Sequence, residues 1–132
     1  MSKQVSSRRW GFTPANIPSD GIFDMGPAAT SHGVGTMVIQ FVMSENFVGS
    51  IAVLGRVFGV AAQEADAMFG PIPYRRVQVN GAASDYTMVA DAITQPGIIQ
   101  IPANGLAIGL GVSCSAGSCD VVSWDLMGPS AV

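Results

Sequence analysis

The two cysteines of the chain, Cys114 and Cys119, lie near its C-terminal end with four residues between them. Thiolates at short spacing can bind zinc or exchange disulfides. A zinc site takes four ligands, commonly from paired Cys and His, and this chain holds two Cys and one His. A thioredoxin-like site has two residues between its cysteines rather than four. We therefore expect no metal site, no redox site and no cofactor.

His32, in the segment TSHGVG, is the remaining candidate for acid–base chemistry. A Ser-His-Asp arrangement needs a serine and a carboxylate nearby in space, and the chain lacks the GxSxG pattern of a nucleophile elbow. The GVG that follows His32 lacks the Lys and Ser/Thr of a phosphate-binding loop. We interpret His32 as an ordinary loop residue and expect the protein not to be an enzyme. A small hydrolase that uses His32 is the alternative.

The stretch GLGVSCSAGSCDVVSWDLMG, which holds both cysteines, has the alternation of a β-strand followed by a turn and a second strand. If SAGS forms the turn of a hairpin, Cys114 faces Cys119 across it. In that register Gly109 lies opposite Trp124 and Gly111 lies opposite Val122. A large ring over a cross-strand glycine supports a strand that the glycine weakens. We predict a structural hairpin built on Cys114, Cys119, Gly109, Gly111 and Trp124.

A disulfide between Cys114 and Cys119 is geometrically possible in this hairpin. The start of the chain, MSKQVSSRRWGF, lacks the apolar run of a secretory signal, which indicates assembly in a cytoplasm. Because cytoplasm keeps thiols reduced, we expect two buried or half-buried thiols and leave the disulfide as the alternative.

Short β-rich runs, separated by turn signals, fill most of the chain from residue 36 onward. The expected strands cover 36–43, 47–60, 74–79, 85–93, 97–102, 106–114 and 119–127, and the one helix-compatible stretch covers 61–70. Asn80-Gly81 is a strong hairpin signal. The pattern predicts an all-β fold, a β-sandwich or jelly-roll-like domain over residues 36–132.

Residues 1–35 lack any hydrophobic period and are rich in Pro and Gly. This composition predicts an extended N-terminal arm that contacts a partner surface. The residues expected to make that contact are Arg8, Arg9, Trp10, Phe12, Ile17 and Phe23.

Charge is scarce and unevenly placed along the chain. Asp, Glu, Lys and Arg make up 11% of the residues, against about 25% in an average protein, while 48% are hydrophobic. So few charged and so many hydrophobic residues indicate that part of the protein surface is apolar and is buried against partners. Residues 1–19 carry three basic residues and no acid, which is too few charges for strong nucleic-acid binding. No apolar run reaches the ~18 residues of a membrane helix, so we expect no membrane partner.

Arg75 and Arg76, on the expected strand 74–79, point to opposite faces of that strand. We expect one to be solvated and the other to pair with an acid of a neighbouring chain. The alternative is that both protect an edge strand against aggregation.

The phrases GSIAVLGRVFG, PIPYRRVQVNG and GIIQIPANGLAIGLGVSCSAGSCDVVSWDLMG resemble the small β-sandwich virion proteins of tailed bacteriophages, such as head decoration and spike proteins. The likeness covers residues 36–128. It implies a symmetric homo-oligomer, often a trimer, that sits on a capsid or tail and stabilises it or contacts a host surface.

The sequence thus predicts a virion structural protein, a capsid decoration or minor capsid subunit that binds copies of itself and the major capsid protein or another virion protein. The alternative is a receptor- or carbohydrate-binding β-sandwich module of a phage fibre or tail.

Overall fold

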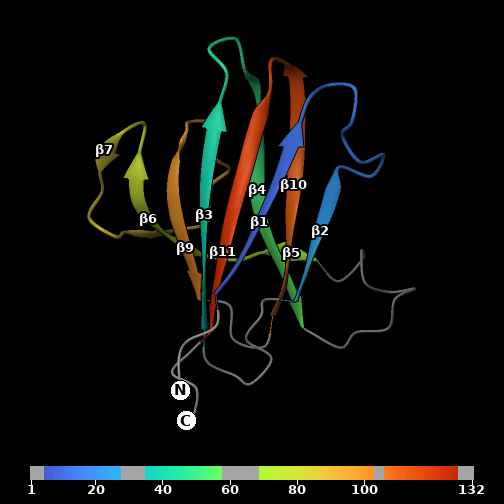
Figure 1. The fold of residues 1–132 in the computed structure, drawn as a ribbon. Helices are drawn as coiled ribbons and strands as arrows, with labels where there is room; N and C mark the ends of the chain where they lie inside the picture. The colour runs from blue at the N-terminus through green and yellow to red at the C-terminus, as the bar shows by residue number, and fades with distance from the viewer. Residues whose placement is uncertain (1–4, 28–34, 58–68, 103–105, 128–132) are drawn as a thin grey trace.

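The computed structural model describes residues 5–27, 35–57, 69–102 and 106–127, which form two antiparallel sheets (Figure 1). Sheet A contains, in spatial order, β1 (Val5–Phe12), β11 (Cys119–Met127), β3 (Gly35–Met43), β9 (Gly97–Pro102), β6 (Tyr74–Val79) and β7 (Ala82–Ala83), and β8 (Met88–Val89) also pairs with β6. Sheet B contains β2 (Ile22–Pro27), β10 (Leu106–Ala116), β4 (Val48–Val57) and β5 (Gly70–Pro71). No helix occurs in these ranges, which confirms the all-β prediction.

The hydrophobic core lies between the two sheets, as in a β-sandwich. It takes alternate residues from strands of both sheets because successive side chains of a strand point to opposite faces. Its fully buried large side chains include Met37, Ile39, Phe41, Ile51, Tyr74, Ile101, Ile108, Leu110 and Val121.

Several expected strands lie where the sequence pattern placed them. The runs 74–79, 97–102 and 119–127 coincide with β6, β9 and β11. Asn80 and Gly81 both have positive φ, 49° and 83°, and connect β6 to β7 as the predicted hairpin turn. The helix-compatible stretch 61–70 lies mostly outside the described residues, and so does His32.

The predicted hairpin of 106–127 is wrong. A turn does follow Ala116, with Gly117 at a φ of 75°, but it connects the two sheets instead of two neighbouring strands. β10 pairs with β2 and β4 in sheet B, whereas β11 pairs with β1 and β3 in sheet A. Cys114 and Cys119 therefore lie on facing sheets, and no cross-strand register joins them.

The glycines of β10 are covered by a different aromatic ring from the predicted one. A Cβ at Gly109 would meet Cε1 of Phe69 at 2.8 Å, so it is Phe69, just before β5, that lies over Gly109. Trp124 is on the outer face of the other sheet and is 52% exposed. Gly111 lies near Ala52 and Leu54 of β4. An aromatic ring does cover Gly109, as predicted, but the ring is that of Phe69 and not that of Trp124.

The described part of the N-terminal segment belongs to the sandwich. β1 pairs with β11 at one edge of sheet A, and β2 pairs with β10 at one edge of sheet B. Phe12 and Met25 belong to the core and are 4% and 3% exposed. The segment is extended, as predicted, but it completes both sheets and does not form an arm separate from a body that starts at residue 36.

Candidate functional site

The residues predicted to contact a partner come together, but most of them face inward. The rings of Trp10 and Phe23 pack edge to face with centroids 5.2 Å apart, and those of Phe12 and Phe23 do so at 5.3 Å. Trp10, Ile17 and Phe23 are partly buried against the core, and Phe12 is fully within it. These side chains close the sandwich between β1 and β2. Their expected contact with another molecule stays a prediction.

Arg8 and Arg9 lie on opposite faces of β1. The guanidinium of Arg8 lies 5.3 Å from the ring centroid of Trp10, and its Nη1 donates a 2.7 Å hydrogen bond to the carbonyl of Met25 in β2. Arg8 therefore links the edges of the two sheets within one molecule. Of the six predicted contact residues, Arg9 is the one that is exposed.

Both cysteines are buried free thiols. Burial, followed by the nearby Asp120 carboxylate and the Cys114 thiol, raises the pKa of Cys119 to about 12. A thiol with so high a pKa is protonated at neutral pH and is a poor nucleophile. These two residues are thus core components at the turn between the sheets.

The outer face of sheet A carries exposed and half-exposed apolar side chains on neighbouring strands. Its centre consists of side chains from three neighbouring strands, which we call the outer patch: Val38, Gln40, Val42, Ile98, Val122 and Trp124. Trp124 and Val42 are 52% and 48% exposed. Val38, Gln40, Ile98, Val122 and Trp124 line a shallow hollow of about 210 Å³.

Charged residues lie at the margins of the outer patch. Arg9 of β1 is the register partner of Val122, Arg75 of β6 is the partner of Gln100, and Asp120 of β11 is the partner of Val42. All three charged side chains are exposed. An apolar centre containing a Trp and surrounded by charges has the composition of a protein interface.

Sequence reasoning missed the outer patch, although the strand TMVIQFVM carried a signal for it. A sheet with one face in water alternates apolar and polar residues. Here the core positions Met37, Ile39 and Phe41 alternate with Val38, Gln40 and Val42, so both faces are largely apolar. That pattern indicates a second buried face.

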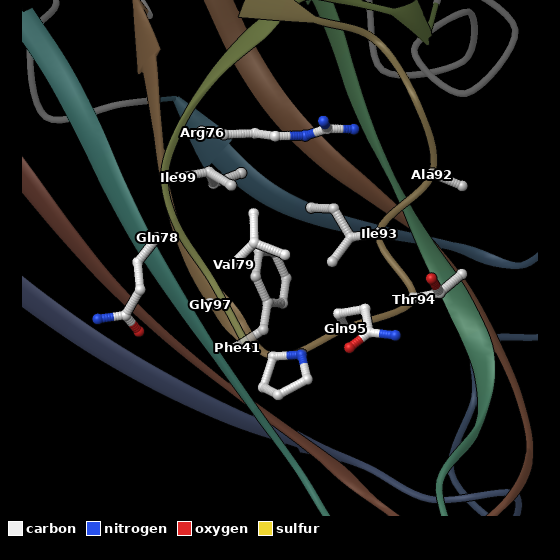
Figure 2. Close-up of a pocket in the computed structure, with 11 residues that line it drawn as sticks. Phe41, Arg76, Gln78, Val79, Ala92, Ile93, Thr94, Gln95, Gly97 and Ile99 are labelled. Atoms are coloured by element: carbon white, nitrogen blue, oxygen red, sulfur yellow. The ribbon is translucent and has the colours of Figure 1, made fainter. Parts of the chain in front are cut away.

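A second feature is a pocket of about 190 Å³ beside β6 (Figure 2). Figure 2 shows the ring of Phe41 and the side chain of Val79 facing Ile93, with Arg76 extended across one end. Gln95 lies near the opposite end. The pocket is thus an apolar space with polar groups at its ends.

The polar end of the pocket is held by hydrogen bonds. Nη2 of Arg76 donates to Oδ2 of Asp91 over 3.0 Å, and the Tyr74 hydroxyl donates to the Asp91 backbone carbonyl over 2.7 Å. Burial raises the pKa of Tyr74, more than the nearby Arg76 guanidinium lowers it. Arg75 and Arg76 do point to opposite faces, as predicted, but Arg76 pairs with an acid of its own chain.

The part of the chain that the structure describes holds no group of three or more His, Cys, Asp or Glu that could bind a metal ion. Within the same ranges no helix has the length and hydropathy required to cross a bilayer.

No family model, curated protein or solved structure matches this chain. What the fold and the site define is a class: an all-β protein of two antiparallel sheets, with an apolar outer face on one of them.

Proposed function

We propose that the protein is a structural subunit of a phage virion that assembles with copies of itself, and with a shell protein, through the outer patch of sheet A. The observation that carries this proposal is the exposure of Trp124 and Val42 on the neighbouring strands β11 and β3, on the same face as Val38, Ile98 and Val122. A contiguous apolar surface of this kind typically marks an interaction site.

The size of the face is sufficient for an interface. Five strands from β1 to β6, spaced ~4.8 Å apart and rising ~3.3 Å per residue, give an outer face on the order of 500 Å² in projection. Specific interfaces bury about 800 Å² of accessible surface per partner, and accessible surface exceeds projected area. The free edge of β1 is a less suitable route to self-assembly, because a second β1 would bring Arg8 and Arg9 near the same residues of its partner.

The solution mass of the purified chain tests this proposal. Sedimentation velocity should give a closed oligomer, with a trimer as the expected size, and Val38→Glu should shift it to the monomer with unchanged circular dichroism. Val48→Glu is the matched control, since Val48 is 57% exposed on sheet B, away from the outer patch. A monomeric wild type, or an oligomer that Val38→Glu leaves intact, contradicts assembly through this face.

Location on a virion requires a separate measurement. Gold-labelled antibody raised against the purified chain should decorate intact particles of the encoding phage at regular positions. Unlabelled particles together with a soluble oligomer would refute the virion assignment and leave the self-assembly standing.

A receptor- or carbohydrate-binding module is the second candidate, favoured by the loop around Tyr86. Tyr86 is 52% exposed and has a φ of 62°, which is uncommon for a residue with a side chain. It stands between Asp85 and Thr87, whose hydroxyl and backbone N–H donate to the Asp85 carboxylate. Binding on a glycan array or to host cells that Tyr86→Ala abolishes would support this candidate, and the absence of binding in both assays would exclude it.

A further inference from the structure

The pocket beside β6 has walls that are fixed before any ligand arrives. The register of β6 against β9 shifts between Arg76 and Gln78, which marks a β-bulge. Gly97 permits close approach there, because a Cβ on it would lie 2.2 Å from the carbonyl oxygen of Gln78. The opposite wall is tied down by the two backbone hydrogen bonds between Ile51 and Ile93, of 2.9 and 2.7 Å. Walls held in this way do not collapse to fill the space.

The size and lining of the pocket fit a small apolar group. Phe41, Val79, Ile93 and Ile99 supply carbon surface around a volume of about 190 Å³. A cavity of roughly 150 Å³ lined by similar residues accepts benzene in another protein. One six-membered ring or a branched aliphatic group of similar size therefore fits here.

The charge at the pocket favours an anion. Arg76 lines the pocket, whereas its partner Asp91 does not and is 70% exposed. The ion pair between them is formed through one nitrogen and one oxygen, Nη2 and Oδ2. A guanidinium offers five N–H donors in a planar fork, so a second carboxylate can bind to another edge of the same group.

We propose that this pocket binds a small organic carboxylate whose ring or branched apolar body enters the space between Val79 and Ile93 and whose carboxylate binds Arg76. Of the charged residues in the described ranges, Arg76 alone lines the pocket, which selects an acid over a neutral or basic ligand of the same shape. This binding is independent of the proposed virion function, because the outer patch lies on the opposite side of sheet A from Arg76 and Ile93.

A titration of the ¹⁵N-labelled protein with benzoate tests the proposal. Benzoate should shift the backbone amides of Ile93, Thr94 and Ile99 with a dissociation constant in the millimolar range, as expected for a ligand of this size. Benzamide, which has the same shape without the charge, and acetate, which has the charge without the ring, should each bind at least about tenfold more weakly. Equal binding of benzamide, or amide shifts confined to other strands, overturns the proposal.

Two variants and one control assign the contact to Arg76. Arg76→Gln should weaken benzoate binding about tenfold or more, and Arg75→Gln, on the opposite face of the same strand, should leave it unchanged. Asp91→Asn should strengthen benzoate binding severalfold, since it removes the competing carboxylate and keeps the pocket lining intact. Weaker binding in Asp91→Asn, or unchanged binding in Arg76→Gln, refutes the role of the guanidinium, even if one variant proves too unstable to measure.

Discussion

The contact between Phe69 and Gly109 supports a quantitative prediction about sheet B. The ring of Phe69 covers Gly109 and lies 5.1 Å from the guanidinium of Arg56, which in turn forms a 3.2 Å ion pair with Asp24 of β2. Complete loss of a buried Phe side chain costs about 3–5 kcal/mol. Because Phe69 is half-buried, we expect Phe69→Ala to lower the free energy of unfolding by about 2 kcal/mol.

Gly109→Ala should have opposite effects in the two backgrounds. In the wild type the new Cβ would lie 2.8 Å from Cε1 of Phe69, so the ring must move, at a cost of about 1 kcal/mol. In Phe69→Ala the obstruction is gone, and replacing a strand glycine by alanine should gain about 0.5–1 kcal/mol. The double variant should therefore be more stable than the sum of the single effects predicts, by about 1.5–2 kcal/mol.

Urea unfolding followed by tryptophan fluorescence measures this coupling, and Gly111→Ala is the matched control. A Cβ at Gly111 would lie 3.4 Å from the Ala52 Cβ, an ordinary contact, and does not touch Phe69. Its effect should thus be the same in both backgrounds. Additivity of Phe69→Ala and Gly109→Ala within about 0.5 kcal/mol would refute the placement of the ring over Gly109.

Four further outcomes follow from the packing. Ser123→Ala should raise the free energy of unfolding, measured in urea, by about 1 kcal/mol. The reason is that Ser123 is fully buried and its Oγ has no hydrogen-bond partner among the described residues. A loss of stability would show that the hydroxyl does form a hydrogen bond. Because folding raises the pKa of Cys119 from 9.0 to about 12, the contribution of this thiol to stability should be constant below pH 9 and fall between pH 9 and 12 by up to about 1.4 kcal/mol per pH unit. Cys119→Ala should remove this part of the decline in the free energy of unfolding. Gly49→Ala should lower the free energy of unfolding by more than about 3 kcal/mol or prevent folding, because its Cβ would lie 2.0 Å from the Ser113 carbonyl oxygen. A soluble variant that unfolds at the wild-type temperature would refute this close approach of the two strands. Deleting residues 1–27 should abolish cooperative thermal unfolding, because β1 and β2 complete the two sheets. A truncated chain that still unfolds cooperatively would show that the N-terminal segment is an arm separate from the folded domain.

The faces of the strands could be predicted from the sequence, but the neighbours of each strand could not. Alternation correctly places Val112, Cys114 and Val121 inside, and Cys119 lies inside with them. A hairpin and a turn between facing sheets both bring these residues together in the core, and the local pattern around Gly117 is compatible with either. The choice depends on β2, β4, β1 and β3, which lie far away in the sequence.

The N-terminal segment shows a related limit. Residues such as Pro14, Pro18 and Gly21 leave this segment without a hydrophobic period, so the local pattern indicates an extended arm. The short strands on either side of these three residues acquire their structure from long-range pairing with β11 and β10. Propensity over a local window does not contain this information.

The candidate sites could be predicted from the sequence even less well than the strand neighbours, because tertiary structure brings their residues together. The opposite faces of Arg75 and Arg76 follow from strand geometry alone. The approach of Ile93 and Gln95 to β6 does not, because it depends on the bridge between Ile93 and Ile51 in the other sheet. The apolar residues Val38 and Val42, which alternate with the core residues of β3, indicate the outer patch in the sequence, whereas the low charge content indicates only that some surface contacts partners.

The pairing of β1 with β11 governs when this protein can finish folding. The register joins Val5 to Leu126, so β1 is synthesised more than a hundred residues before the strand that it pairs with in sheet A. During synthesis β1 stays without its partner strand until β11 has emerged from the ribosome, and such long-range closure is slow. Synthesis of β11 is therefore the step that completes sheet A, and until then the unpaired edge of β1 depends on charged residues such as Arg8 and Arg9 to resist aggregation.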